Sequence, residues 1–163
     1  MGPSPAPPHR SLGTFMIKPS TAPYAALVLR SSLGVMFLAH ASLKIFVFTV
    51  PGFVGYFASL GLPAVAAYAV LTVEVLGGLA LILGVYAPVV ALALAVEVLG
   101  TVALVHGANG WLFTNKGGGW EYPGFWAVSL IVLYLLGDGA LALWPARSER
   151  QRGLAHAVRP STE

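Results

Sequence analysis

The sequence contains no cysteine, and only 9% of its 163 residues are charged. The lack of cysteine excludes disulfides, cysteine-ligated zinc, iron–sulfur clusters and dithiol redox chemistry within this chain. A soluble domain typically carries about 25% charged residues, so a surface this poor in charge is unsuited to water. Hydrophobic residues make up 57% of the chain, and the mean hydropathy is +0.80. We therefore expect an integral membrane protein whose main partner is the lipid bilayer.

Four apolar stretches are long enough to cross a hydrocarbon layer of about 30 Å, which takes about 20 helical residues. They are residues 24–48, 63–83, 86–105 and 123–143. The second and the fourth begin with proline, which is favoured in the first turn of a helix. Only Gly84 and Val85 separate the second stretch from the third, so these two should form a tight antiparallel pair. The sequence thus predicts an all-α membrane protein, a bundle of four transmembrane helices.

The basic residues lie mostly near the two ends of the chain and give a net charge of +3. They form no stripe with interleaved aromatic residues, so we expect no nucleic-acid binding. Basic residues beside membrane spans mark the cytoplasmic side. The flank after the last stretch carries four arginines, whereas the loop at 106–122 carries only Lys116. With four spans, both termini are predicted to be cytoplasmic and this loop to face outward.

The membrane domain is predicted to span residues 23–145. Residues 1–22, rich in Pro, Ser and Ala, are predicted to be a disordered tail, and residues 146–163 a basic cytoplasmic tail. Pro51 and Gly52 should end the first helix, and residues 53–62 are then either a short helix at the membrane interface or an ordinary loop.

The predicted outer loop is rich in glycine and aromatic residues. Its segments WLFT and GWEY, on either side of NKGG, are able to pair as a small β-hairpin. Trp111, Trp120 and Tyr122 would then lie in the aromatic belt of the membrane interface. The alternative is a lid over an outward-facing pocket.

Ionisable residues also lie inside the predicted spans: Arg30, His40, Lys44, Glu74, Glu97 and Asp138. A charge at mid-membrane costs about 2.5–3.5 kcal/mol even on insertion scales, so each residue needs a partner inside the bundle. Helical spacing places the three basic ones on one face of the first helix. Two interpretations stay open: a structural network of ion pairs, or a polar site with a proton path.

Depth in the membrane suggests the partners. We expect Arg30 to pair with Asp138, and His40 to have Glu74 as its carboxylate partner. Glu74 lies on a face of small residues that lets another helix approach closely. Glu97 lies at a similar depth in the next stretch, and we group it with the structural ion pairs. We predict no metal site, and two histidines, His40 and His106, are weak evidence for a haem.

Several short motifs follow one another in a recognisable order. They are Arg30-x-x-Leu33-Gly34-x-x-Phe37-x-x-His40 with Lys44; Phe57 with Gly61-Leu62-Pro63 and Ala67-Tyr68; Glu74-x-x-Gly77-Gly78-x-x-Leu81-x-x-Gly84; and His106 with Glu121-Tyr122-Pro123. Together they resemble the DoxX family of membrane proteins over roughly residues 24–140. The chain departs from the family pattern at Ala41, where glycine is usual, and at Glu97, where an apolar residue is commoner.

The resemblance implies a four-helix bundle in a prokaryotic plasma (inner) membrane. It also implies quinone-linked oxidation of reduced sulfur compounds with partner redox enzymes, or resistance to thiol and quinone stress. The candidate proton and quinone site is His40, Lys44 and Glu74, with Trp120 and Tyr122 as further quinone-binding residues. No side chain here carries electrons by itself, so such a role needs a quinone, another cofactor or a partner protein. The alternatives are a proton-coupled small-molecule transporter, with a homo-oligomer as one option, and a scaffold that anchors soluble partners.

Overall fold

The computed structural model describes residues 20–146, so the two predicted tails lie almost entirely outside the described residues. The described part is all helical. Its elements are α1 (Ala22–Ser42), the π-helix η1 (Leu43–Val47), α2 (Val50–Ser59), α3 (Ala64–Leu83), α4 (Ala87–Thr101), the π-helix η2 (Val102–His106), the short 3₁₀ helix η3 (Gly107–Asn109) and α5 (Glu121–Leu136). The all-α prediction is therefore confirmed for residues 20–146.

Three continuous helical stretches are long and apolar enough to cross a membrane: Ala22–Val47, Ala64–Leu83 and Ala87–Asn109. They match the first three predicted spans closely and fit a multi-pass membrane protein. The fourth apolar helix, α5, has 16 residues and is about 24 Å long at 1.5 Å per residue. A fourth span is therefore not confirmed and stays a prediction.

The predicted end of the fourth stretch at residue 143 is wrong, because α5 stops at Leu136. Gly137 and Gly139 follow with φ of 89° and 74°, a backbone conformation that ends a helix and favours glycine. The chain then lies along the turn between α3 and α4, where the Tyr86 N–H donates to Trp144 O over 2.9 Å. Residues 137–146 therefore close one end of the bundle instead of extending α5.

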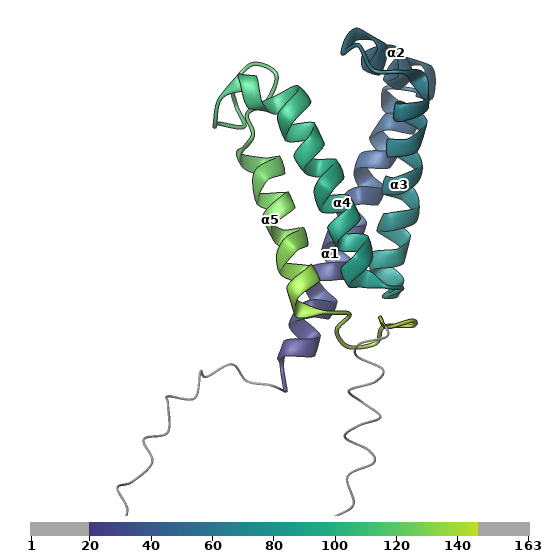
Figure 1. The fold of residues 1–163 in the computed structure, drawn as a ribbon, viewed down its shortest axis with the longest axis vertical. Coiled ribbons are helices and arrows are strands. Elements are labelled where there is room, and N and C mark those ends of the chain that lie inside the picture. Colours follow the sequence, from purple (N-terminus) through teal and green to yellow (C-terminus); the bar gives the residue numbers. More distant parts are fainter. Residues whose placement is uncertain (1–19, 147–163) are drawn as a thin grey trace, which may run out of the picture.

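The helices form two pairs, α1 with α3 and α4 with α5, which are close at the α3–α4 turn and diverge toward α2 and the loop after η3 (Figure 1). We call the first the turn end and the second the loop end. The α1–α3 pair is tight because two glycines face each other: a Cβ on Gly34 would lie 2.6 Å from Gly78 O. The predicted small-residue face of α3 thus receives α1.

At the turn end, the predicted ion pair between Arg30 and Asp138 is wrong, although both side chains are fully buried. The Arg30 guanidinium donates to Leu81 O (2.8 Å), Ile82 O (2.6 Å) and Ala140 O (2.9 Å). Asp138 accepts from the backbone N–H groups of Ala87 (2.9 Å) and Ala146 (2.7 Å). The last carbonyl groups of α3 and the first N–H groups of α4 have no hydrogen-bond partner within their own helices. Arg30 donates to carbonyl groups at the end of α3, and Asp138 accepts from an N–H group at the start of α4.

Of the two alternatives for residues 53–62, the helix is the closer one, but it begins earlier, at Val50. Thr49 has a φ of 61° and breaks the first helix, and its hydroxyl accepts from the Gly52 N–H to cap α2. The predicted β-hairpin at 111–122 is not confirmed. Residues 110–120 form turns around glycines with positive φ, and no strand forms within residues 20–146.

Candidate functional site

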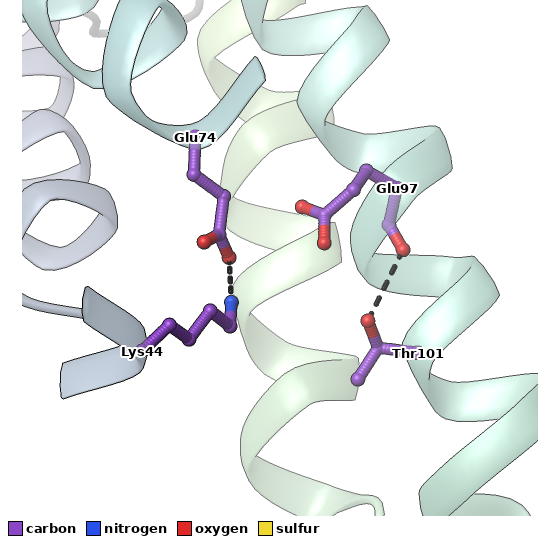
Figure 2. Close-up of polar contacts among 4 residues, drawn as sticks. All are labelled: Lys44, Glu74, Glu97 and Thr101. Carbon is purple, nitrogen blue, oxygen red and sulfur yellow. Dashed lines mark hydrogen bonds and ion pairs between the residues drawn. The ribbon is translucent and has the colours of Figure 1, made fainter. Parts of the chain in front are cut away.

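A charged cluster lies between the two helix pairs. Lys44, on the π-helix η1, forms an ion pair with Glu74 of α3 (Figure 2). Its ammonium also lies 5.3 Å from the centre of the Phe53 ring. The Glu74 side chain is 4% exposed and that of Lys44 is 17% exposed, so the pair is largely withdrawn from the surface. A π-helical turn changes the direction in which side chains leave the helix, and such turns are frequent at functional sites.

The second carboxylate of the cluster comes from Glu97 on α4. Figure 2 shows its carboxyl group turned toward the side on which Lys44 and Glu74 lie. Thr101 donates to the Glu97 backbone carbonyl (3.3 Å). Among the described residues, none gives a hydrogen bond to Glu97 Oε2 or to Glu74 Oε2. The cluster therefore has two carboxyl groups for one ammonium, and one buried oxygen of each carboxyl group has no hydrogen-bond partner among the described residues.

A cavity of about 880 Å³ opens beside this cluster, between α2 on one side and α3 and α4 on the other. Its polar lining residues are His40, Lys44, Glu97, Thr101 and His106, and its aromatic wall includes Phe48, Phe53, Tyr56 and Phe57. Apolar walls with a few converging polar groups, in a volume of about 300–1,000 Å³, are typical of small-molecule sites. This cavity is therefore the candidate ligand site.

A smaller cavity of about 230 Å³ lies on the other side of the cluster. It is lined by Glu74, by Tyr122 and Trp126 of α5, and by Phe113, Gly118 and Gly119 of the loop. Five residues line both cavities: His40, Lys44, Glu97, Thr101 and His106. We call these five the polar wall. It lies between the large cavity and the small one.

His40 lies in the polar wall but forms no hydrogen bond or ion pair with Glu74, its predicted partner, and Lys44 pairs with that carboxylate instead. The His40 ring instead packs against Trp126, with 4.9 Å between centroids, and stacks on Tyr122 at 6.3 Å. His106 is held by the loop, since its Nδ1 lies 2.9 Å from the Gly118 carbonyl oxygen, which can only accept. Both histidines thus connect the polar wall to neighbouring elements.

The two aromatic residues predicted to bind a quinone, Trp120 and Tyr122, lie in different places. Tyr122 lines the small cavity, whereas Trp120 packs edge-on against Trp111 at 4.5 Å and lines neither cavity. Glu97, predicted as a structural ion-pair residue, forms no ion pair with any residue from 20 to 146. That range also contains no group of three or more His, Cys, Asp or Glu residues able to hold a metal ion.

The aromatic wall from α2 was not predicted from the sequence. A signal was available: Phe53, Tyr56, Phe57 and Leu60 follow the spacing i, i+3, i+4, i+7, which places them on one helix face. Thr101 was also missed. A single threonine in an apolar helix gives no such signal, because it commonly bonds the carbonyl four residues earlier, as Thr101 does.

The chain matches a known protein family. The sequence model of the DoxX family matches residues 25–107, just over half of the chain. The match contains Lys44, Glu74 and Glu97 and ends before the loop and α5. No curated protein and no solved structure gives a match. The chain is a membrane protein and belongs to the DoxX family.

Proposed function

We propose that this protein is the quinone-binding membrane component of a redox system, with the large cavity as the site of the quinone ring. The observation that carries the proposal is the cavity itself: about 880 Å³, walled by aromatic and apolar side chains, and ending at the polar wall. A quinone ring needs an apolar slot, hydrogen-bond donors at its carbonyl oxygens and nearby groups that exchange protons. The cavity offers all three.

Lys44 is the best-placed donor. Its ammonium has three N–H groups, and one suffices for Glu74, so the others remain for a carbonyl oxygen in the cavity. Glu74 acts as a positioning residue that holds the ammonium in the polar wall. The Thr101 hydroxyl and the two histidine rings are further hydrogen-bonding groups on the same wall. We assign Trp120 to packing of the loop, because it lines neither cavity.

The bound quinone would accept two electrons and two protons as it becomes a quinol. We propose that a partner enzyme supplies the electrons by oxidising a reduced sulfur compound, whose oxidised product stays with that enzyme. Glu97 and His40 line both cavities, so they are the groups through which protons reach the ring from the loop end.

We further propose that α5 is a fourth span and that residues 23–145 form one domain in a prokaryotic inner membrane. Both termini would then be cytoplasmic and the loop end would face outward. The support is the charge distribution: the arginines follow α5, and the loop carries only Lys116.

A matched pair of glycines tests the quinone site. Gly100 lines the large cavity and Gly55 does not, and a Cβ at either position would meet no atom within 4 Å. Gly100→Leu therefore places an apolar side chain at the cavity from a Cβ position that contacts no neighbour, and Gly55→Leu is its control. We expect wild type and Gly55→Leu to co-purify with quinone from native membranes, measured by mass spectrometry, and Gly100→Leu to lose it about tenfold. No quinone enrichment in wild type over bulk lipid, or full retention in Gly100→Leu, would refute the site.

A further inference from the structure

The charges of the cluster formed by Lys44, Glu74 and Glu97 do not balance. Lys44 is the one Lys or Arg among the residues that line the large cavity, and its ammonium forms an ion pair with Glu74. Glu97 is the second carboxyl group of the cluster, and its Oε2 is buried without a hydrogen-bond donor among residues 20–146. Proton transfer to a neutral quinone uses Glu97 in its protonated form and leaves its carboxylate form without a counter-charge. Such a group in an apolar cavity must take up a proton or meet a cation.

The opposite wall is suited to a cation with an apolar body. The rings of Phe53 and Phe57 pack edge to face with 4.8 Å between centroids, and Tyr56 packs against Phe57 at 6.5 Å. These three residues of α2 line the same cavity as Glu97. Aromatic faces attract cations, and Lys44 already lies over the Phe53 ring in this way. The cavity thus has a carboxylate on one wall and aromatic rings on another.

We propose that the large cavity binds lipophilic organic cations, such as hydrophobic amines and onium ions, with Glu97 as the counter-charge. The cation's charged centre lies toward the Glu97 carboxylate, and its apolar groups contact the α2 aromatic residues. This inference goes beyond the proposed function, because it rests on the carboxylate and the aromatic wall and needs no quinone or electron donor. Its ligand class is defined by charge and shape, not by redox chemistry.

The test uses two probes of one shape and opposite charge, tetraphenylphosphonium and tetraphenylborate. Binding to the purified full chain in lipid nanodiscs is measured by equilibrium dialysis, with empty nanodiscs subtracted. We expect wild type to bind the cation at least about tenfold more tightly than the anion. Equal affinity for the two probes, or a preference for the anion, overturns the proposal without the need for any variant.

Two carboxyl variants locate the charge. Glu97→Gln should weaken cation binding about tenfold or more. The control is Glu121→Gln, because Glu121 accepts from the Phe113 N–H (2.8 Å) and lines neither cavity. Full cation affinity in a folded Glu97→Gln protein, or an equal loss in Glu121→Gln, would overturn the assignment. Quinone content, measured on the same samples, separates the two proposals: quinone without cation binding rejects this inference alone.

Discussion

The two ends of the bundle provide different partners for their buried charged side chains. At the turn end, Arg30 and Asp138 each bind backbone groups left free where helices end, although the two residues have opposite charges. At the loop end, Lys44 and Glu74 bind each other, and Glu97 lies beside them without an ion-pair partner among the described residues. Within residues 20–146, charges of both signs are thus withdrawn from the surface at both ends, but the large cavity and the carboxylate oxygens without a hydrogen-bond partner lie at the loop end.

This contrast assigns different tasks to the two ends. Hydrogen bonds from a charged group to backbone atoms tie neighbouring elements together, so the turn end holds α1, α3, α4 and the segment after α5 in place. A side-chain cluster beside a cavity contributes less to that framework and is open to a ligand. This difference can be measured as the change in stability on substitution and as the coupling between paired residues.

The largest effect is expected at the turn end. Arg30→Met leaves three carbonyl groups without their donor and should destabilise the fold by about 3 kcal/mol or more. Because Arg30 and Asp138 bind separate backbone groups, the losses in Arg30→Met and Asp138→Asn should add in the double variant. The measurement is thermal unfolding of purified protein, with the yield of monodisperse protein as a second readout. A double variant as stable as the poorer single one would show that the two charges act as a pair.

At the turn end, the sequence predicted the helices but not the partners of the buried charges. The apolar runs located three helices closely, and α3 begins one residue after the predicted Pro63. Depth along a span gave the wrong partners, because it contains no information on the direction or the reach of a side chain. Arg30 and Asp138 are at similar depths, yet the nearest groups they satisfy are backbone atoms of helix ends.

At the loop end, the sequence indicated that Lys44 and Glu74 belong to one site but not that they contact each other. The π-helix at Leu43–Val47 accounts for part of this, since it alters the spacing of side chains in a way that no residue pattern announced. The glycines at 137 and 139 were visible, but the apolar run through residues 140–144 concealed the end of α5. Hydropathy thus reports burial in lipid or protein, and backbone conformation decides where a helix ends.

An intermediate effect, with the opposite coupling, is expected for Lys44 and Glu74. Lys44→Met leaves the Glu74 carboxylate buried without its cation and should cost more stability than Glu74→Gln, which still accepts a hydrogen bond from the lysine. The double variant should be more stable than Lys44→Met alone, because it removes the unpaired charge together with its partner. Thermal unfolding of the four proteins measures this coupling, and additive losses would mean that the pair does not act as a unit.

The smallest effect on stability is expected for Glu97→Gln. Its Oε2 receives no hydrogen bond and its carboxylate forms no ion pair within residues 20–146, so replacing it with an amide should remove little of what holds the fold. Removing an uncompensated charge should leave the free energy of unfolding unchanged or raise it by about 1 kcal/mol. Asp138→Asn is the matched control at the other end, because that carboxylate binds two backbone N–H groups and the amide can satisfy only one of them through its oxygen. Parallel unfolding of the two variants should therefore show a loss for Asp138→Asn and none for Glu97→Gln. Equal losses would mean that Glu97 also belongs to the framework of the bundle, and that the two ends do not divide stability and ligand binding between them.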